Sequence, residues 1–149
     1  MKTDLVVAGF IFKEDKVLLI HHKKLNKWLP PGGHINKDET PDEALIREIK
    51  EETNLDVEII NKSDLPLEGD VKKQLALPFY INVHSVDDHD HCCLFYLCNL
   101  NNKSELNINR NELKNFNWFS LEDLKKEIVS ADVSNIAKKA FGIWETARK

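Results

Sequence analysis

The stretch REIKEETNL, residues 47–55, places three carboxylates on adjacent turns of what its apolar spacing predicts to be one amphipathic helix. Glu48, Glu51 and Glu52 are three and four residues apart, so they share one helix face. Like charges at these spacings repel by roughly 0.2–0.5 kcal/mol per pair. They also lie near the C-terminal end of the helix, where its dipole favours cations instead. The arrangement therefore predicts a positively charged group that offsets the repulsion.

The start of this helix is marked by Thr40-Pro41-Asp42-Glu43. Thr40 as N-cap and Glu43 at the third position form a capping box, and Pro41 occupies the first helical position, which tolerates proline. The apolar flank, turned by roughly a third of a circle from the glutamate face, consists of Leu45, Ile46 and Ile49.

The end of the helix falls at Asn54. The residue after a helix usually adopts the left-handed conformation, which asparagine tolerates better than most residues other than glycine. We therefore predict a positive φ at Asn54.

A metal ion is the simplest source of the missing positive charge. Carboxylate oxygens at fixed positions suit Mg²⁺ or Mn²⁺, which retain waters and bind where substrate phosphates complete the coordination shell. An isolated acidic helix face is usually only solvated surface. Here, however, the helix follows a Pro-Gly-Gly turn at residues 31–33 and is fixed at its start by the capping box.

Composition describes a globular chain of one-domain size. The chain has 149 residues, of which 42% are hydrophobic and 31% charged, with a formal charge of −4. The acidic balance argues against a protein that coats long nucleic acid. No apolar run approaches the ~20 residues that span a bilayer, and the run at 5–12 lacks a signal-peptide cleavage site. The chain has three clustered cysteines whose spacing is not that of metal ligands, Cys92, Cys93 and Cys98. They indicate free buried thiols and a cytoplasmic location.

The order of expected elements is α+β, in one domain covering residues 1–149. We expect a hairpin of strands 5–12 and 16–22, then a loop at 24–35 containing two prolines and two glycines. Further strands are expected at 55–60, 78–86, 91–100 and 117–120, with 61–77 as a loop that has possible strand pairing. Ser120 is expected to cap a helix over 121–128, and a last helix is expected to begin at Asp132 or Ser134.

One motif ties these features together. Gly33, five residues, Glu39, seven residues, then residues 47–55 resemble the Nudix box, G-x5-E-x7-R-E-U-x-E-E-x-G-U, where U is aliphatic. Eight of the nine specified positions agree over 23 residues, and Asn54 replaces the family glycine. The lead-in WLPPGGHI (28–35) and the segment NELKNFNWFSLEDL (111–124) also resemble family members. The resemblance implies the Nudix fold, a mixed β-sheet sandwiched between α-helices.

The resemblance also implies roles for individual residues. Glu48, Glu51 and Glu52 are similar to the family's metal ligands, which the carbonyl of Gly32 often joins. Arg47 and Glu39, with Gly33 at the head of the box, resemble the positions that orient these carboxylates. Glu112 is similar to a glutamate that supplies a further ligand or the general base in some members. The implied cofactor is Mg²⁺ or Mn²⁺.

The implied activity is hydrolysis of the diphosphate linkage in a nucleoside diphosphate joined to another group, by water attacking phosphorus. The implied partner is this small nucleotide, with no membrane and no long nucleic acid, and a homodimer would be ordinary for the family. Two alternatives stay open: a Nudix-fold binding or sensor domain without turnover, and an isopentenyl diphosphate isomerase on the same fold. The latter family's TNxCxxHP-type segment is missing from the sequence.

Several other side chains are weaker candidates. The string HSVDDHDH (84–91) is either a polar hairpin tip or a substrate-side loop that contacts phosphate or a further metal. His84 and His34 are candidates for substrate contact, and Trp28 and Phe79 could stack on a nucleobase or belong to the core. His21 and His22 are expected to have a structural role at the end of their strand.

Overall fold

The fold is built around two long neighbouring strands that are far apart in the sequence. In the computed structural model, which describes residues 2–101, 103–126 and 128–148, the strands are β1 (Thr3–Lys13), β2 (Lys16–His22), β3 (Lys27–Leu29), β4 (Gly32–His34), β5 (Val57–Ile59), β6 (Tyr80–Val86), β7 (His89–Leu100) and β8 (Leu113–Phe119). The helices are α1 (Pro41–Thr53), the short 3₁₀ helix η1 (Asp123–Lys125) and α2 (Ala131–Ala147).

β1 and β7 run parallel, from Thr3 opposite Asp90 to Phe12 opposite Asn99. All the other strand pairs are antiparallel: β2 and β4 pair with β1, β5 and β6 pair with β7, and β3 and β8 pair with β2. The sheet is therefore mixed, and the α+β class expected from the sequence is confirmed.

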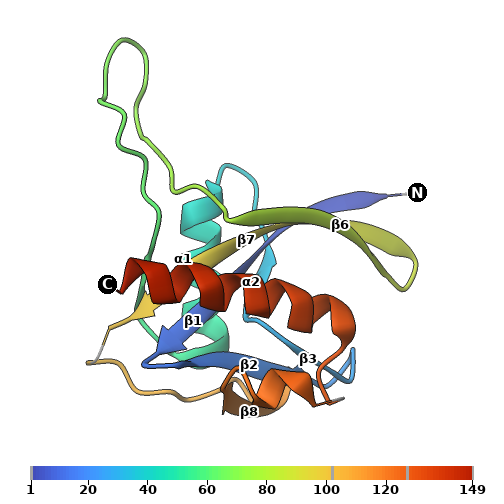
Figure 1. Cartoon of the computed structure of the whole chain (residues 1–149). Helices are drawn as coiled ribbons and strands as arrows, with labels where there is room; N and C mark the ends of the chain where they lie inside the picture. Colours follow the sequence, from blue (N-terminus) through green and yellow to red (C-terminus); the bar gives the residue numbers. More distant parts are fainter. Residues whose placement is uncertain (1, 102, 127, 149) are drawn as a thin grey trace.

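A helix covers each face of this sheet (Figure 1). Because side chains alternate along a strand, β1 contributes Phe10 and Phe12 to one core and Val7 and Ile11 to the other. The first core is closed by Phe141 and Trp144 of α2, and the Phe12 and Trp144 rings stack 4.9 Å apart. The second is closed by Leu45 and Ile49 of α1.

The capping box of α1 is confirmed. Thr40 Oγ1 accepts from the Glu43 amide at 3.2 Å, and Glu43 Oε1 accepts from the Thr40 amide at 3.1 Å, with Pro41 in the first turn. Of the apolar flank expected on this helix, Leu45 and Ile49 are fully buried, whereas Ile46 is 40% exposed. Ile46 lies at the edge of the apolar stripe, where the sheet no longer covers it.

The C-terminal end of α1 is closed by a loop from later in the chain. Asn54 has φ 64° and ψ 9°, so its predicted left-handed conformation is confirmed, and its amide donates to the Lys50 carbonyl. The amides of Asn107 and Asn109 donate to the carbonyls of Thr53 and Glu52 at 2.9 and 2.8 Å. These bonds satisfy carbonyls that a helix end otherwise leaves without partners.

Several expected boundaries differ from the observed ones. The loop at 24–35 contains the short strands β3 and β4, and β7 begins at His89 rather than at residue 91 because a tight turn at Asp87 (φ 49°) extends the pairing. β6 begins at Tyr80 rather than at residue 78, and β5 covers only part of 55–60. The strand expected at 117–120 begins at Leu113. The last helix begins at Ala131, one residue before Asp132, with Ser130 at the N-cap position.

The helix expected over 121–128 is reduced to η1. Ser120 and Asp123 exchange side-chain-to-amide hydrogen bonds of 3.0 and 3.2 Å, as a helix start would. However, Lys126 is already extended, and Leu121 and Ile128 are 37% and 56% exposed. With Leu124 as the buried anchor, the segment has too narrow an apolar face to hold a longer helix.

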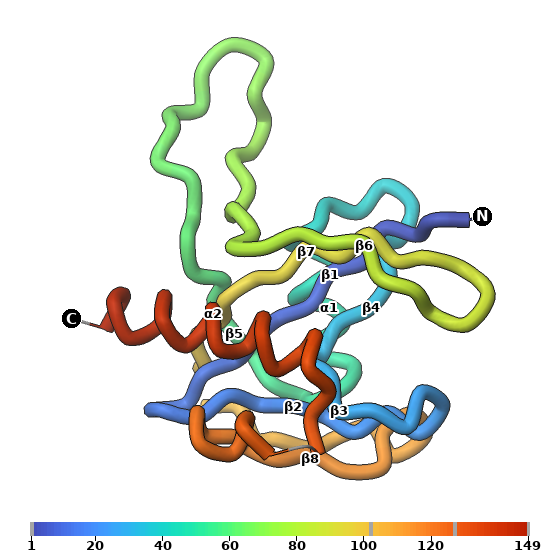
Figure 2. The backbone as a smooth tube through the Cα atoms, turned by 45° about the vertical axis from the view of Figure 1, so that its right-hand side comes forward, coloured from blue at the N-terminus to red at the C-terminus, as the bar shows by residue number. Residues whose placement is uncertain are grey.

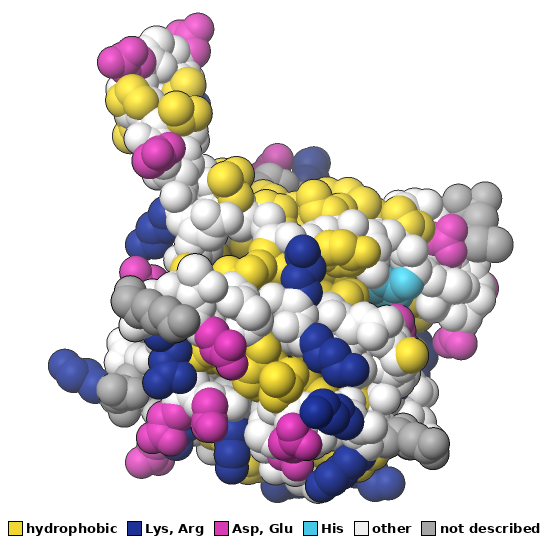
Figure 3. All heavy atoms as spheres, viewed as in Figure 1, with side chains coloured by type: hydrophobic (Ala, Val, Ile, Leu, Met, Phe, Trp, Pro, Cys, Tyr) yellow, Lys and Arg dark blue, Asp and Glu magenta, His cyan; other side chains and the backbone are white. Residues whose placement is uncertain are grey.

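Residues 61–79 form an irregular excursion that projects from the sheet without any strand of its own (Figures 1 and 2). Its base is fixed by the Ala76 amide, which donates to Asp42 Oδ2 of α1 at 3.0 Å. Figure 3 shows apolar side chains along the projection, which include the exposed Leu65 and Leu67. In the described part of the chain, no helix is long and apolar enough to cross a membrane.

Asn54 gives a direct test of the helix end. Replacing it with alanine or glycine removes the Asn54 Nδ2 bond to the Glu105 carbonyl in both variants, but only alanine is disfavoured at positive φ. We expect the free energy of unfolding of Asn54→Ala, measured by urea denaturation, to be about 1 kcal/mol lower than that of Asn54→Gly. Equal stabilities would mean that position 54 is not left-handed.

The cysteines give a second test. All three are free, Cys93 and Cys98 are buried, and burial raises the pKa of Cys93 to about 12 and that of Cys98 as well. Because the thiolate is the reactive form, we expect both thiols to resist alkylation in the native protein at pH 8 and to react after denaturation. Mass spectrometry of the alkylated peptides measures this, and rapid native labelling of Cys98 would contradict it.

Candidate active site

Two consecutive glycines bring the β4 backbone against the acidic face of α1. A Cβ atom at Gly33 would lie 2.5 to 2.7 Å from the carboxylate atoms of Glu48, and one at Gly32 would lie 2.0 Å from the Val7 carbonyl oxygen. Neither position has room for a side chain. The Pro-Gly-Gly turn therefore allows the close approach of strand and helix that places Glu48 at the backbone.

Glu52 is the most buried of the three carboxylates, with 2% of the residue exposed. Its Oε1 accepts from the Gly32 amide at 2.8 Å, and its Oε2 lies 3.6 Å from His22 Nε2. A buried carboxylate needs such partners to replace the hydrogen bonds that it loses from water. Glu52 thus joins α1 to both β4 and the end of β2.

Arg47 supplies the positive charge at the centre of the acidic group. Its guanidinium donates from Nε and Nη2 to the two carboxylate oxygens of Glu39 at 2.8 and 3.0 Å, and from Nη1 to Glu48 Oε1 at 2.9 Å. Nη1 also lies 3.3 Å from Glu51 Oε2, and Nη2 donates to the His34 carbonyl at 2.9 Å. The bond from Arg47 is the main cause that lowers the pKa of Glu39, and these carboxylates raise that of Arg47.

The environment of Glu48 disfavours its charged form, although Arg47 is close to it. Burial is the largest influence and raises its pKa, Arg47 opposes this, and the charges of Glu52 and Glu51 raise the pKa further. Carboxylates at this density, beside a backbone with no side chains, are donors of the type that Mg²⁺ and Mn²⁺ prefer. The residues present therefore fit the divalent cation expected from the motif.

His22 is a residue of this site that the sequence reasoning missed, because it assigned His21 and His22 a structural role. The hydrogen bond with Glu52 is the main influence that raises the pKa of His22, and the charge of Glu112 adds to it. Glu112 itself is exposed in the turn before β8, where its carbonyl accepts from the Lys23 amide at 3.0 Å. The β2–β8 pairing thus brings Glu112 to the side of the site that His22 occupies.

The side chains of the other candidates make their contacts with groups other than the carboxylates of α1. Trp28 packs edge-on against Phe119 at 5.2 Å, and Phe79 packs edge-on against Phe10 at 5.9 Å, so both rings contact the core on the α2 side. His34 and His84 come together around His91, with ring centroids 5.2 and 5.6 Å from it. Their roles in substrate binding stay predictions.

Comparison with known proteins identifies the family of this chain. The NUDIX domain family model matches residues 2–139. The chain belongs to the Nudix family. A solved structure of a Nudix-family hydrolase from Clostridium perfringens superimposes with a TM-score of 0.80 and 32% identity, over 97% of this chain and 99% of the other. The Nudix fold expected from the box is confirmed.

The curated relatives of this Nudix chain include proteins that are named as pyrophosphohydrolases. The asymmetrical bis(5′-nucleosyl)-tetraphosphatase of Caenorhabditis elegans is 30% identical over 112 residues, covering 75% of this chain and 72% of that protein. The RNA pyrophosphohydrolase of a Marinomonas species is 45% identical over 61 residues, and the match spans only 38% of either chain. A C. elegans Ap4A hydrolase structure, at 20% identity and a TM-score of 0.73, shares the fold.

The close approach of Gly33 to the Glu48 carboxylate can be tested by metal binding. A methyl group at Gly33 must displace the Glu48 carboxylate, so we expect Gly33→Ala to weaken Mn²⁺ binding at least about tenfold, a loss typical when a ligand is misaligned. Electron paramagnetic resonance of free Mn²⁺ measures this.

Gly142→Ala is the matched control, since a Cβ there meets nothing within 4 Å and alanine favours the helix by about 1 kcal/mol. It should bind Mn²⁺ as the wild type does. Wild-type affinity in Gly33→Ala would contradict the assignment of Glu48 to the cation site.

Proposed function

We propose that residues 1–149 form one Nudix hydrolase domain that hydrolyses the diphosphate linkage of a nucleoside diphosphate joined to another moiety. The observation that supports this most directly is the Arg47 network, which holds Glu39, Glu48 and Glu51 beside the Gly32–Gly33 backbone while Glu52 is bonded to that backbone. The box residues thus form one connected group around the expected cation site.

Glu48, Glu51, Glu52 and the carbonyl of Gly32 would hold Mg²⁺, and Mn²⁺ would substitute. When bound, the ion neutralises phosphate oxygens and makes a neighbouring water more acidic. Arg47 and Glu39 are positioning residues in this scheme. They keep the carboxylates on one side of α1 and prevent their mutual repulsion from separating them.

Water then attacks one phosphorus of the diphosphate, a carboxylate accepts the proton of the water, and the bond from that phosphorus to the bridging oxygen breaks so that the other phosphate leaves with this oxygen. Glu112 is our candidate for this base among residues outside α1, because it is exposed and faces the His22 side of the site. Glu51 is the candidate on α1, because 57% of its side chain is accessible, more than for Glu48 or Glu52. No covalent enzyme intermediate is needed, since hydrolysis can occur by direct displacement.

Dinucleoside polyphosphates are the first substrates to test. The relative with that named specificity aligns with 75% of this chain, whereas the match to the RNA pyrophosphohydrolase covers 38%. The net charge of −4 also disfavours long RNA. Nucleoside triphosphates, ADP-ribose-type sugars and short 5′-triphosphorylated RNA complete the panel. The free cysteines support a reducing, cytoplasmic setting for this reaction.

The alternatives predict different products. A domain that binds nucleotides without turnover releases neither phosphate nor nucleotide from any member of the panel. A diphosphate isomerase converts isopentenyl diphosphate to dimethylallyl diphosphate without releasing phosphate. Chromatography of the reaction products in Mg²⁺ separates these outcomes from hydrolysis.

The deciding variant is Glu52→Gln. Removing this charge should lower kcat/KM on the best substrate by about two orders of magnitude or more, because charge stabilisation at a metal site is worth several kcal/mol. Glu58→Gln, on β5 with a 70% exposed side chain, is the matched control and should retain wild-type activity. Full activity in Glu52→Gln would overturn the ligand assignment.

A second variant separates the candidate bases. If Glu112 accepts the proton, Glu112→Gln should lower kcat about a hundredfold, in the range of general base catalysis, with little change in KM. The same substitution should leave Mn²⁺ affinity unchanged if Glu112 is not a ligand. Unchanged kcat would assign the base to α1 instead.

A further inference from the structure

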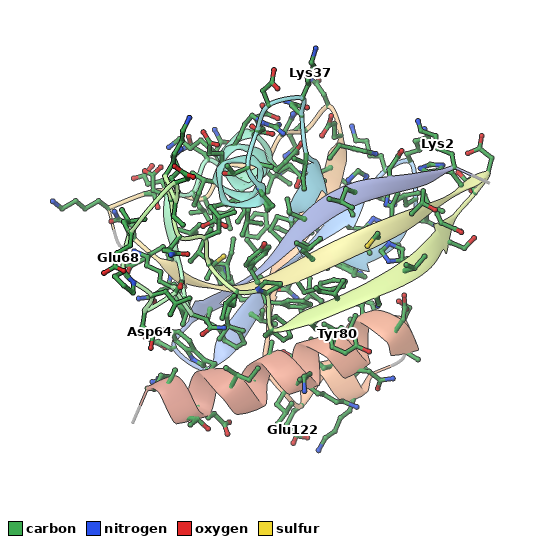
Figure 4. The ribbon with its side chains drawn as sticks, turned by 90° about the horizontal axis from the view of Figure 1, so that it is seen from above. Lys2, Lys37, Asp64, Glu68, Tyr80 and Glu122 are labelled. Atoms are coloured by element: carbon green, nitrogen blue, oxygen red, sulfur yellow. The ribbon has the colours of Figure 1, made fainter. Side chains whose placement is uncertain are left out.

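A second cluster of ligating side chains lies at the end of the sheet formed by the N-terminus and the β6–β7 turn. The register places Asp4 of β1 opposite His91 of β7, His91 opposite His84 of β6, and Val6 opposite His34 of β4. Because directly paired residues project to the same side of a sheet, four neighbouring strands present these groups on one face. Lys2, labelled in Figure 4, marks this end of the molecule beside the tip of β6 and β7.

The ligating atoms converge on one point. One atom each from Asp4, His34, His89 and His91 lies within 4.8 Å of all the others. Asp4 Oδ2 is 3.1 Å from His34 Nε2 and 3.6 Å from His89 Nε2, and His89 Nε2 is 3.0 Å from His91 Nε2. His34 and His89 thus direct Nε2 toward Asp4 Oδ2, and His91 directs its Nε2 toward His89 Nε2.

Three of the six separations among these four atoms are those of a tetrahedral coordination shell. For metal–ligand bonds of about 2.0 Å, ligand atoms on neighbouring corners are about 3.3 Å apart, close to the three distances observed. In addition, His89 Nδ1 lies 3.0 Å from Asp88 Oδ1. A hydrogen bond to a carboxylate at one ring nitrogen leaves the other free to ligate, as in many metal-bound histidines.

We propose that Asp4, His34, His89 and His91 form a binding site for a divalent transition-metal ion, with Zn²⁺ as the ion that best fits three imidazoles and one carboxylate. This site differs in chemistry from the all-oxygen group on α1, because imidazole favours Zn²⁺ and similar ions whereas Mg²⁺ prefers oxygen. His84 lies outside the ligand set. Its Nδ1 is 3.2 Å from Asn82 Oδ1.

The two sites share β4. His34 directs its ring to Asp4, and its backbone carbonyl accepts from Arg47 at 2.9 Å. Lys2 Nζ pairs with Asp4 Oδ1 at 3.4 Å, which leaves Oδ2 facing the imidazoles. An ion held by β1, β4 and β7 would therefore fix the strand that carries Gly32 and Gly33, so it acts as a structural cross-link beside the α1 site.

Metal binding tests this independently of turnover. Metal-free protein is titrated with Zn²⁺ against a chromophoric chelator, in millimolar Mg²⁺ to occupy the α1 site, and separately with Co²⁺ to record its visible absorption. We expect one Zn²⁺ per chain and the intense Co²⁺ bands of tetrahedral coordination. His91→Gln and Asp4→Asn should each weaken Zn²⁺ binding at least about tenfold, as loss of a ligand requires.

His84→Gln is the matched control, an imidazole 5.6 Å from His91 that should not affect Zn²⁺ affinity. Circular dichroism of the metal-free variants confirms that each is folded. Wild-type Zn²⁺ affinity in both ligand variants, or equal loss in His84→Gln, would overturn the proposal. Glu52→Gln should lose turnover and keep Zn²⁺ binding, so failure of this site and failure of the hydrolase assignment give different results.

Discussion

The candidate active site depends on the hydrogen bonds and ion pairs that the guanidinium of Arg47 makes. One cation contacts Glu39 in the loop before α1, Glu48 and Glu51 on the helix, and the carbonyl of His34 on β4. A planar group with five donors can satisfy several acceptors in fixed directions, which lysine cannot. Without it, the half-buried carboxylates would repel one another. The acidic helix face and the glycine strand are stable together because this residue lies between them.

Both ends of α1 are also fixed, so its carboxylates have little freedom to move along the sheet. The capping box fixes the first turn from within the local sequence, whereas the last turn depends on Asn54 and on amides of residues 107 and 109. The same connection leads directly to Glu112 and then β8, which pairs with the strand ending in His22. The helix end and the His22 side of the site are thus positioned by one segment.

Local sequence patterns predicted the structural features that depend on residues close together in the chain. The capping box and the left-handed Asn54 follow from the residue types within a short stretch, and the grouping of Glu39, Arg47 and Glu48 follows from the resemblance to the Nudix box. The contacts of His22 with Glu52 and of Asp4 with His89 could not be predicted, because they depend on strand register between distant segments. The helix expected after Ser120 was wrong for a related reason. Its capping residues are present, but the rest of the fold buries Leu124 and leaves Leu121 and Ile128 exposed, so the helix ends at η1.

The parallel pairing of β1 with β7 has a consequence for synthesis on the ribosome. Residues 3–12 are buried on both faces for most of their length, yet their central partner comprises residues 90–99. At translation rates of roughly 5–20 residues per second, the emerging N-terminal hairpin waits several seconds before that partner is available. During this interval its apolar strand and open edge are exposed, which makes the nascent chain a candidate client for chaperones that bind extended hydrophobic segments.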